Sequence, residues 1–320
     1  MPIYEFGEWV PDLPLLEKVG TDGGTIGLEA ATNVLPFDTS YKQFPGMSVF
    51  SDALTARAQG AISARDNDGN IFNFAGDATK LYRLSDATWS DVSSASTYGT
   101  AADEQWEFAQ FSNIMLGTNF ANPIQTYTMG TSSAFTQLAT AAPQARHIGV
   151  VRDFVVTGNT FDSSDGNVPY RVRWCGINDP TDWTISATTQ ADQQDLDGPG
   201  GWVQKVVGGE YGTIISERSI WRMTYVGSPA IFQFDEVETS QGTPAPGSVI
   251  KFGNLVAYLG DDGFYVFDGA RSIPIGVNKI DKTFYADMDL DHFGRIYSAI
   301  DPINQLLFWT YPGVGNTGGS

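Results

Sequence analysis

The stretch Gly253-Asn254-Leu255-Val256-Ala257-Tyr258-Leu259 is followed, after a short polar turn, by Gly263-Phe264-Tyr265-Val266-Phe267. Each part begins with a turn and continues as a short apolar segment, and the second segment is rich in aromatic residues. Apolar runs of this length, bounded by glycine, asparagine or aspartate, are typical of β-strands. The stretch therefore predicts two strands of one sheet joined by a tight turn.

The same unit recurs along the whole chain. Its turns lie at positions 69, 113, 153, 210, 254 and 304, so that successive units are 44, 40, 57, 44 and 50 residues apart. A four-stranded propeller blade occupies about 40–50 residues. The alternation in Tyr170-Arg171-Val172-Arg173-Trp174 is typical of a half-buried strand, and only Thr283–Leu290 suggests a helix. We predict an all-β protein, a β-propeller of about six blades with an extended N-terminal arm.

Three regions follow from this interpretation. Residues 1–27, rich in proline, glycine and acidic side chains, form the extended arm, residues 28–312 form the propeller, and residues 313–320 form a flexible tail. The chain ends soon after Trp309, inside the last predicted blade, and an incomplete blade exposes unpaired backbone groups. Strands from residues 32–50, or strands from a neighbouring subunit, could complete the ring.

Composition and charge exclude several classes of protein. The 320 residues include 18 basic and 37 acidic side chains, for a formal charge of −19 and a pI near 4.2. A protein that grips DNA through its phosphates needs a basic surface, so the acidic balance argues against that class. Aromatic residues make up 13% and charged residues 17%, which argues against a coiled coil and against disorder. We expect neither a signal peptide nor a membrane span, because no basic leader and no long apolar stretch is present.

Few residues suggest catalysis or metal binding. The single cysteine, Cys175, excludes a disulfide framework, and two histidines, His147 and His292, are too few for a histidine-rich metal site. Asp66-Asn67-Asp68-Gly69-Asn70 begins like a calcium loop, but its glycine is fourth rather than sixth, which favours a hairpin turn. Ser85-Asp86-Ala87-Thr88-Trp89 lacks the spacing and the glycine of a sialidase Asp-box. We therefore predict no catalytic residue, no cofactor and no metal site, and a protein that is not an enzyme.

One region carries a more specific pattern. Arg152-Asp153-Phe154-Val155-Val156-Thr157-Gly158 precedes Tyr170-Arg171-Val172-Arg173-Trp174 and then Gly176-Ile177-Asn178-Asp179-Pro180-Thr181-Asp182-Trp183. This order of strand, strand ending in Arg-Trp, and Asp-Pro-x-Asp-aromatic turn resembles the β-propeller virion proteins of tailed bacteriophages, including the nozzle proteins of short-tailed phages. Similar segments elsewhere are Asn33-Val34-Leu35-Pro36, Gly242-Thr243-Pro244-Ala245-Pro246-Gly247-Ser248-Val249 and Ile300-Asp301-Pro302.

The resemblance implies a structural component of a phage virion. Its expected role is that of a ring-forming tail subunit, in a nozzle or a head–tail connector, which forms part of the conduit for DNA ejection. The expected partners are copies of itself in a ring of six, other tail or connector proteins, and genomic DNA that passes an acidic wall without specific binding. The protein would be made in the bacterial host cytoplasm and located in the virion tail. The arm would dock on a neighbouring subunit, and the blade turn would be fixed by Arg173, Trp174, Asp179, Pro180 and Trp183.

Two alternatives stay open. The propeller could bind a host-surface glycan, with exposed aromatic side chains as stacking platforms, although a core or interface position is favoured for each of them. The candidates are Trp9, Trp89, Trp106 and Trp202. A propeller glycoside hydrolase is less favoured, because nothing in the sequence selects a pair of carboxylates from the 37 acidic residues.

Overall fold

Tight turns determine which strands pair. Arg152 has a φ of 51° and is the first of the two residues that connect β11 (Gln144–Val151) to β12 (Phe154–Asp162). Ser112 also has a φ of 51° and is the first of the two residues that connect β7 (Glu107–Phe111) to β8 (Ile114–Thr118). Two-residue turns with positive φ match the right-handed twist of antiparallel strands, so strands that follow one another in the sequence lie side by side.

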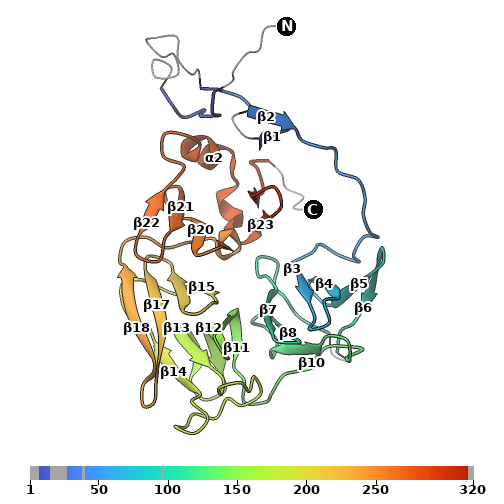
Figure 1. Ribbon diagram of the computed structural model, residues 1–320, viewed down its shortest axis with the longest axis vertical. Helices are drawn as coiled ribbons and strands as arrows, with labels where there is room; N and C mark the ends of the chain where they lie inside the picture. The colour runs from blue at the N-terminus through green and yellow to red at the C-terminus, as the bar shows by residue number, and fades with distance from the viewer. Residues whose placement is uncertain (1–6, 15–26, 38–39, 95–96, 316–320) are drawn as a thin grey trace.

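The computed structural model describes residues 7–14, 27–37, 40–94 and 97–315. Within these residues, five antiparallel sheets of four strands stand around a central axis, and each sheet is one blade of a β-propeller (Figure 1). In each blade the first strand in the sequence is an edge strand that faces the axis, and the next three follow outward in order.

The first three blades account for residues 61–195. Their strands are β3 (Ala61–Arg65), β4 (Ile71–Gly76), β5 (Leu81–Ser85) and β6 (Thr88–Asp91); β7 (Glu107–Phe111), β8 (Ile114–Thr118), β9 (Gln125–Thr128) and β10 (Thr136–Gln137); and β11, β12, β13 (Gly166–Trp174) and β14 (Asp192–Asp195).

The last two blades account for residues 203–274. Their strands are β15 (Val203–Val207), β16 (Gly212–Ser216), β17 (Ile220–Gly227) and β18 (Ile231–Glu238), then β19 (Ile250–Phe252), β20 (Leu255–Leu259), β21 (Phe264–Phe267) and β22 (Ser272–Pro274). A short helix, η1 (Pro246–Ser248), precedes β19.

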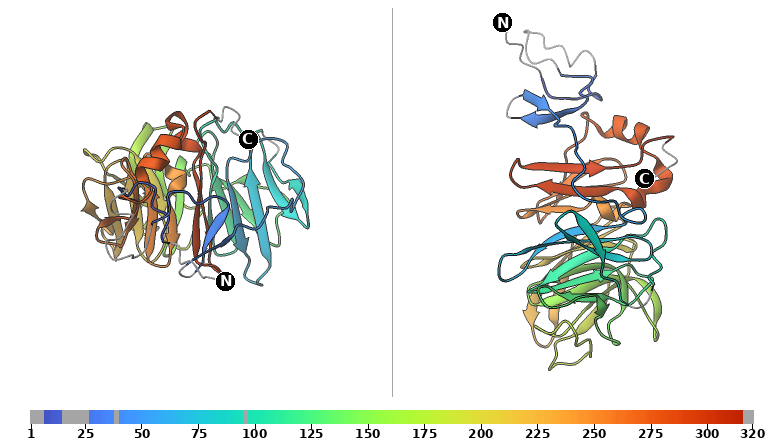
Figure 2. Two further views of the ribbon diagram at one scale, coloured as in Figure 1. Left: turned by 90° about the horizontal axis from the view of Figure 1, so that it is seen from above. Right: turned by 90° about the vertical axis from the view of Figure 1, so that its right-hand side faces the viewer.

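The all-β propeller is confirmed, but the prediction of about six blades is wrong, because the described residues form five. The sixth unit of the sequence makes only a two-stranded sheet, β23 (Tyr297–Asp301) paired with β24 (Leu306–Thr310). The remaining two strands, β1 (Val34–Phe37) and β2 (Ser40–Gln43), lie within the region expected to complete the ring. They pair with each other instead of with β24 (Figures 1 and 2).

Apolar side chains between neighbouring blades form the core. The largest buried cluster spans the second, third and fourth blades and includes Trp174 and Trp183. A second cluster, between the first two blades, contains Phe74, Tyr127 and Phe135, whose ring centroids lie 5.1 to 5.5 Å apart. Because each sheet packs face to face on its neighbours, the blades support one another as a rigid block.

Two neighbouring blades approach closely where Gly208 follows β15. A Cβ atom at Gly208 would lie 2.1 Å from the carbonyl oxygen of Val150 in β11. Backbone bonds join the two blades at this place, from Arg152 N to Gly209 O at 2.8 Å and from Gly209 N to Val150 O at 3.0 Å. The contact therefore has no room for a side chain.

Gly208→Ala is expected to lower the free energy of unfolding by about 3 kcal/mol, since the extra methyl forces two bonded backbones apart. Urea denaturation measures the loss. Gly198→Ala is the matched control, because nothing lies within 4 Å of a Cβ at Gly198. Equal stability of the two variants would mean that the blades separate here without cost.

The described part of the arm, residues 7–14, contacts the chain's own C-terminal region. Asp12 accepts hydrogen bonds from the backbone N–H groups of Lys282 and Thr283, at 2.6 and 3.0 Å, at the start of α2 (Asp281–Asp287). Asp12 thereby takes the place of an N-cap side chain, which Ile280 cannot provide. The rest of the arm lies largely outside the described residues, and its docking on a neighbouring subunit stays a prediction.

The predicted helix at Thr283–Leu290 overlaps α2, and a second short helix, η2 (Leu290–Arg295), follows it. Among the described helices, none is long and apolar enough to cross a membrane. The predicted tail, residues 313–320, is described only as far as residue 315.

Candidate functional site

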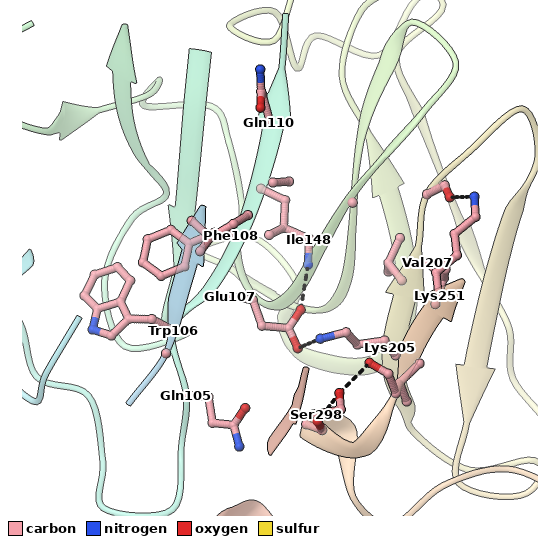
Figure 3. A pocket seen from close by; sticks show the side chains of 18 of the residues that line it. Gln105, Trp106, Glu107, Phe108, Gln110, Ile148, Lys205, Val207, Lys251 and Ser298 are labelled. Carbon is pink, nitrogen blue, oxygen red and sulfur yellow. Dashed lines mark hydrogen bonds and ion pairs between the residues drawn. The ribbon is translucent and has the colours of Figure 1, made fainter. Parts of the chain in front are cut away.

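The innermost strands surround a channel along the propeller axis (Figure 3). Its volume is about 430 Å³, enough for about 14 water molecules at roughly 30 Å³ each. All five blades and β23 contribute to its wall. Each of these six strands contributes at least one lining residue. In chain order, one from each strand is Ala61, Glu107, Ile148, Lys205, Lys251 and Ser298.

A buried ion cluster centred on Glu107 crosses one side of this channel. Glu107 is 7% exposed, and its Oε1 accepts a hydrogen bond from Lys205 Nζ at 2.8 Å and lies 2.9 Å from His147 Nδ1. Its Oε2 accepts from the backbone N–H of Ile148 at 3.3 Å. Glu107 lies in β7, His147 and Ile148 in β11, and Lys205 in β15, so one carboxylate joins the inner strands of three consecutive blades.

The charges of this cluster determine what it can do chemically. Burial alone would raise the pKa of Glu107, but the charges and hydrogen bonds of Lys205 and His147 outweigh burial, and the pKa falls from 4.5 to about 2. A general acid or base works best when its pKa is near the working pH. Glu107 is therefore a fixed anion at neutral pH, and its role is to hold the blades together.

Glu107 and Lys205 were not among the residues predicted from the sequence, and His147 was considered there only as a metal ligand. Glu107 and Lys205 are 98 positions apart, so no spacing rule connects them. One weak signal was present, namely a glutamate at the start of the strand Glu107–Phe111, where an apolar inner-strand position is the ordinary choice.

Of the five predicted turn residues, Arg173 and Trp174 end β13, and Asp179, Pro180 and Trp183 lie in the turn that follows it. Trp183 is 1% exposed, and its Nε1 donates to the carbonyl oxygen of Pro180 at 2.9 Å. Arg173 Nη2 donates to the carbonyl oxygen of Trp183 at 3.2 Å. Asp179 Oδ1 accepts from the N–H and the hydroxyl of Thr181, at 2.9 and 2.6 Å, which closes the turn.

Trp174 joins the same region to the next strand. It is 2% exposed, and its Nε1 donates to the carbonyl oxygen of Gln190 at 2.9 Å, just before β14. Its ring packs edge-on against Phe232 of the following blade, with centroids 5.2 Å apart. These contacts concern the shape of the blade and offer no chemistry.

The four tryptophans considered as stacking platforms differ in exposure. Trp106 is 3% exposed and lies in the core between the first two blades, the kind of position favoured for it, so it offers no stacking platform. Trp9 and Trp89 are half-buried, with Nε1 bonded to Glu29 O and Ser51 Oγ respectively. Trp202 is 51% exposed, which leaves its indole face available for a contact.

The remaining candidates have structural surroundings. The carboxylate of Asp66 accepts hydrogen bonds within its own turn, where Oδ1 accepts from the backbone N–H groups of Asp68 and Asn70 at 3.0 and 2.7 Å. Cys175 is buried, and burial raises the pKa of its thiol to about 12. His292 Nδ1 lies 2.9 Å from Asp289 Oδ2 in η2. Over the described ranges, no three histidine, cysteine, aspartate or glutamate side chains converge to hold a metal ion.

Comparisons with known proteins give a general likeness only. No family model matches the chain, and no curated protein matches it. The computationally designed protein Ika8 is 11% identical over 63% of this chain and 57% of its own, with a TM-score of 0.39. An extracellular domain from B. thetaiotaomicron, described as belonging to a one-component system, is 15% identical over 69% of this chain and 34% of its own, with a TM-score of 0.37.

A second designed protein, Ika4, is 11% identical over 70% of this chain and 98% of its own, with a TM-score of 0.33. The chain thus spans 57% and 34% of the lengths of the first two proteins. Likenesses of this size assign no function.

Proposed function

We propose that this chain is a non-enzymatic structural subunit of a phage virion, which joins copies of itself in a ring of the tail, at the nozzle or the head–tail connector. The ring would form part of the conduit through which DNA is ejected. The sequence segments that resemble phage propeller proteins are spread over residues 30–312. A rigid propeller with a formal net charge of −19 suits such a building block.

The observation that most directly supports a ring is that one chain exposes both an open strand edge and an apolar segment. Over the described residues, β24 pairs only with β23, so one edge of its backbone has no strand partner. The hairpin of β1 and β2 lies beyond this sheet in Figures 1 and 2, without hydrogen bonds to it. An open strand edge is a template for pairing with another chain.

The segment that follows the hairpin adds to this argument. Met47, Val49 and Phe50 are 88%, 92% and 78% exposed, although apolar side chains this close together are ordinarily covered. Exposed apolar side chains also flank the open sheet, among them Ile303 at 90%. When two different patches of one chain fit each other, the contact is heterologous, and a heterologous contact that closes makes a ring.

The propeller's own channel does not suit DNA. It holds about 430 Å³ and is crossed by the Glu107 cluster. We therefore place the conduit between copies, along the axis of the ring, where acidic walls would repel the phosphates and let the duplex slide.

Immunogold labelling of particles from the source culture tests the location. Gold at one vertex or along the tail is expected, and its position distinguishes connector from nozzle. Particles that stay unlabelled, even after gentle disruption exposes inner surfaces, would overturn the proposal.

The double variant Met47→Lys, Val49→Asp is expected to keep the monomer fold and to lose self-association by at least about tenfold, because both side chains are almost fully exposed in the single chain. Mass photometry over a concentration series measures the assembly. Val226→Asp, at a 49% exposed site on β17, is the matched control. Assembly that is equal in both variants would show that this segment is not the joint.

A further inference from the structure

A second hollow adjoins the channel, from which it is separated by Gln105 and Glu107. This mouth pocket has a volume of about 220 Å³, room for about seven water molecules at roughly 30 Å³ each. Most of the residues that line it have polar side chains. The residues that the argument uses are Glu104, Arg146, His147, Asn159, Trp202 and Gln204.

Two irregular strands deliver amide side chains to this pocket. The register of β12 against β13 shifts between Gly158 and Thr160, so Asn159 is the extra residue of a bulge, with a φ of 56° and 1% exposure. The register of β15 against β16 shifts in the same way around Gln204. Bulges re-aim side chains and are frequent next to functional sites. Two bulges meet at this pocket, which favours a binding site here.

The pocket also holds the guanidinium group of Arg146 in a fixed position. Arg146 Nε donates to Glu104 Oε1 at 3.0 Å, and Nη1 donates to Asn159 Oδ1 at 3.0 Å. The guanidinium carbon lies 3.8 Å from the centroid of the Phe120 ring. With one face against Phe120 and its N–H groups bonded to Glu104 and Asn159, the Arg146 side chain is pre-organised before any ligand arrives.

His147 supplies a buried polar atom that lacks a partner. Its side chain is 4% exposed, and Nε2 has no hydrogen-bond partner among the described residues. Because a carboxylate only accepts, Nδ1 carries the hydrogen toward Glu107, which leaves Nε2 as an acceptor in the neutral ring and as a donor in the protonated ring. A buried polar atom without a partner is unfavourable, and a hydroxyl group can either donate or accept, so a ligand that brings a hydroxyl to Nε2 gains a hydrogen bond.

The charges around the pocket indicate a neutral ligand. Glu104 is paired with Arg146 at 2.9 Å, and Glu107 is paired with Lys205 at 2.8 Å. Asp103, at the same rim, is paired with Arg295 at 3.0 Å. Arg146, Lys205 and Arg295 are thus each paired with a carboxylate, so none of the three offers a free positive charge to an anionic ligand.

Trp202 gives the pocket one apolar face. It is 51% exposed, and its backbone is fixed by Glu217, whose N–H donates to Trp202 O at 3.0 Å. An exposed indole beside several planar polar side chains suits a ring with one apolar face and a rim of hydroxyl groups.

We propose that the mouth pocket binds one neutral sugar ring, with Trp202 against its apolar face and with hydroxyl groups bonded to His147 Nε2, Asn159 and Gln204. The inference stands on the pocket alone and does not depend on the ring of copies.

Saturation-transfer NMR with the purified protein tests it. The probes are the methyl glycosides of glucose, galactose, mannose and N-acetylglucosamine, with methyl glucuronide as the anionic comparison. Each is used at up to about 10 mM, so that binding with a Kd of about 1 mM is detected. One or more neutral glycosides are expected to bind. Trp202→Ala and Gln204→Ala should each weaken that binding by at least about tenfold.

Trp202 and Gln204 reach solvent, so both variants should fold, and their circular dichroism should equal that of the parent protein. Tyr211→Ala, which removes an exposed aromatic outside the mouth pocket, is the matched control and should bind as the parent does. The proposal is overturned if no neutral glycoside binds, if only the glucuronide binds, or if Trp202→Ala and Tyr211→Ala behave alike.

Discussion

Replacing Glu107 by glutamine is expected to lower the free energy of unfolding by about 3 kcal/mol at neutral pH, because the change leaves Lys205 without its buried counter-charge. Glutamine has nearly the same shape, so the loss reports charge rather than volume. Urea denaturation of the parent and the variant measures it. The double variant Glu107→Gln, Lys205→Met should regain part of the loss, since the stranded cation is then removed as well.

The same carboxylate predicts a dependence on acid. The folded pKa of Glu107 is about 2, below its ordinary value of 4.5. A depressed pKa contributes stability that is fully present above pH 4.5 and is lost as the pH falls toward 2. The difference corresponds to about 3 kcal/mol at roughly 1.4 kcal/mol per pKa unit. Glu107→Gln should flatten this part of the stability curve, and an unchanged slope would mean that other carboxylates are responsible.

Truncating Trp183 to alanine is expected to cost about 3–5 kcal/mol, the usual range for removing a large buried aromatic side chain. The indole is 1% exposed, belongs to the largest core cluster and donates to Pro180 O. Thermal unfolding followed by circular dichroism measures the effect. The change should lower the melting temperature by several degrees, in proportion to the lost stability.

Asp179→Ala is the matched control for that experiment. It removes a carboxylate from the same turn but takes nothing from the core, so a loss of about 1 kcal/mol is expected. If Trp183→Ala were no worse than Asp179→Ala, the turn would be held by its backbone, and the indole would be dispensable.

The blades could be predicted from sequence because each is made of neighbouring strands. The turn before Phe154 and the alternation around Arg171 are local patterns, and local patterns determine hairpins. The strand Leu306–Thr310 has the same apolar pattern as a strand of a complete blade. That pattern does not determine how many further strands pair beside it. The count of six failed for this reason, since the number of strands in a sheet depends on contacts between distant segments.

The site was far less predictable. Glu107 and Lys205 meet only because two inner strands converge on the axis, and Asn159 reaches the mouth pocket through a bulge that no pattern announces. Trp106 and Trp202 could not be told apart from sequence as candidate stacking platforms, yet the ring of Trp106 fills the space beside Gly76 in the core, whereas Trp202 is 51% exposed. Side-chain environment in this fold is decided by the packing of one blade against the next.

The buried position of Cys175 has a practical consequence for labelling. Its thiol is enclosed, donates to the carbonyl oxygen of Gly176, and has a pKa raised to about 12, so almost none of it is thiolate at neutral pH. Maleimides and other thiol reagents act on accessible thiolate. A cysteine introduced on the surface would therefore be the one reactive position in the chain, and a fluorophore or spin label placed there would report distances from a single known point.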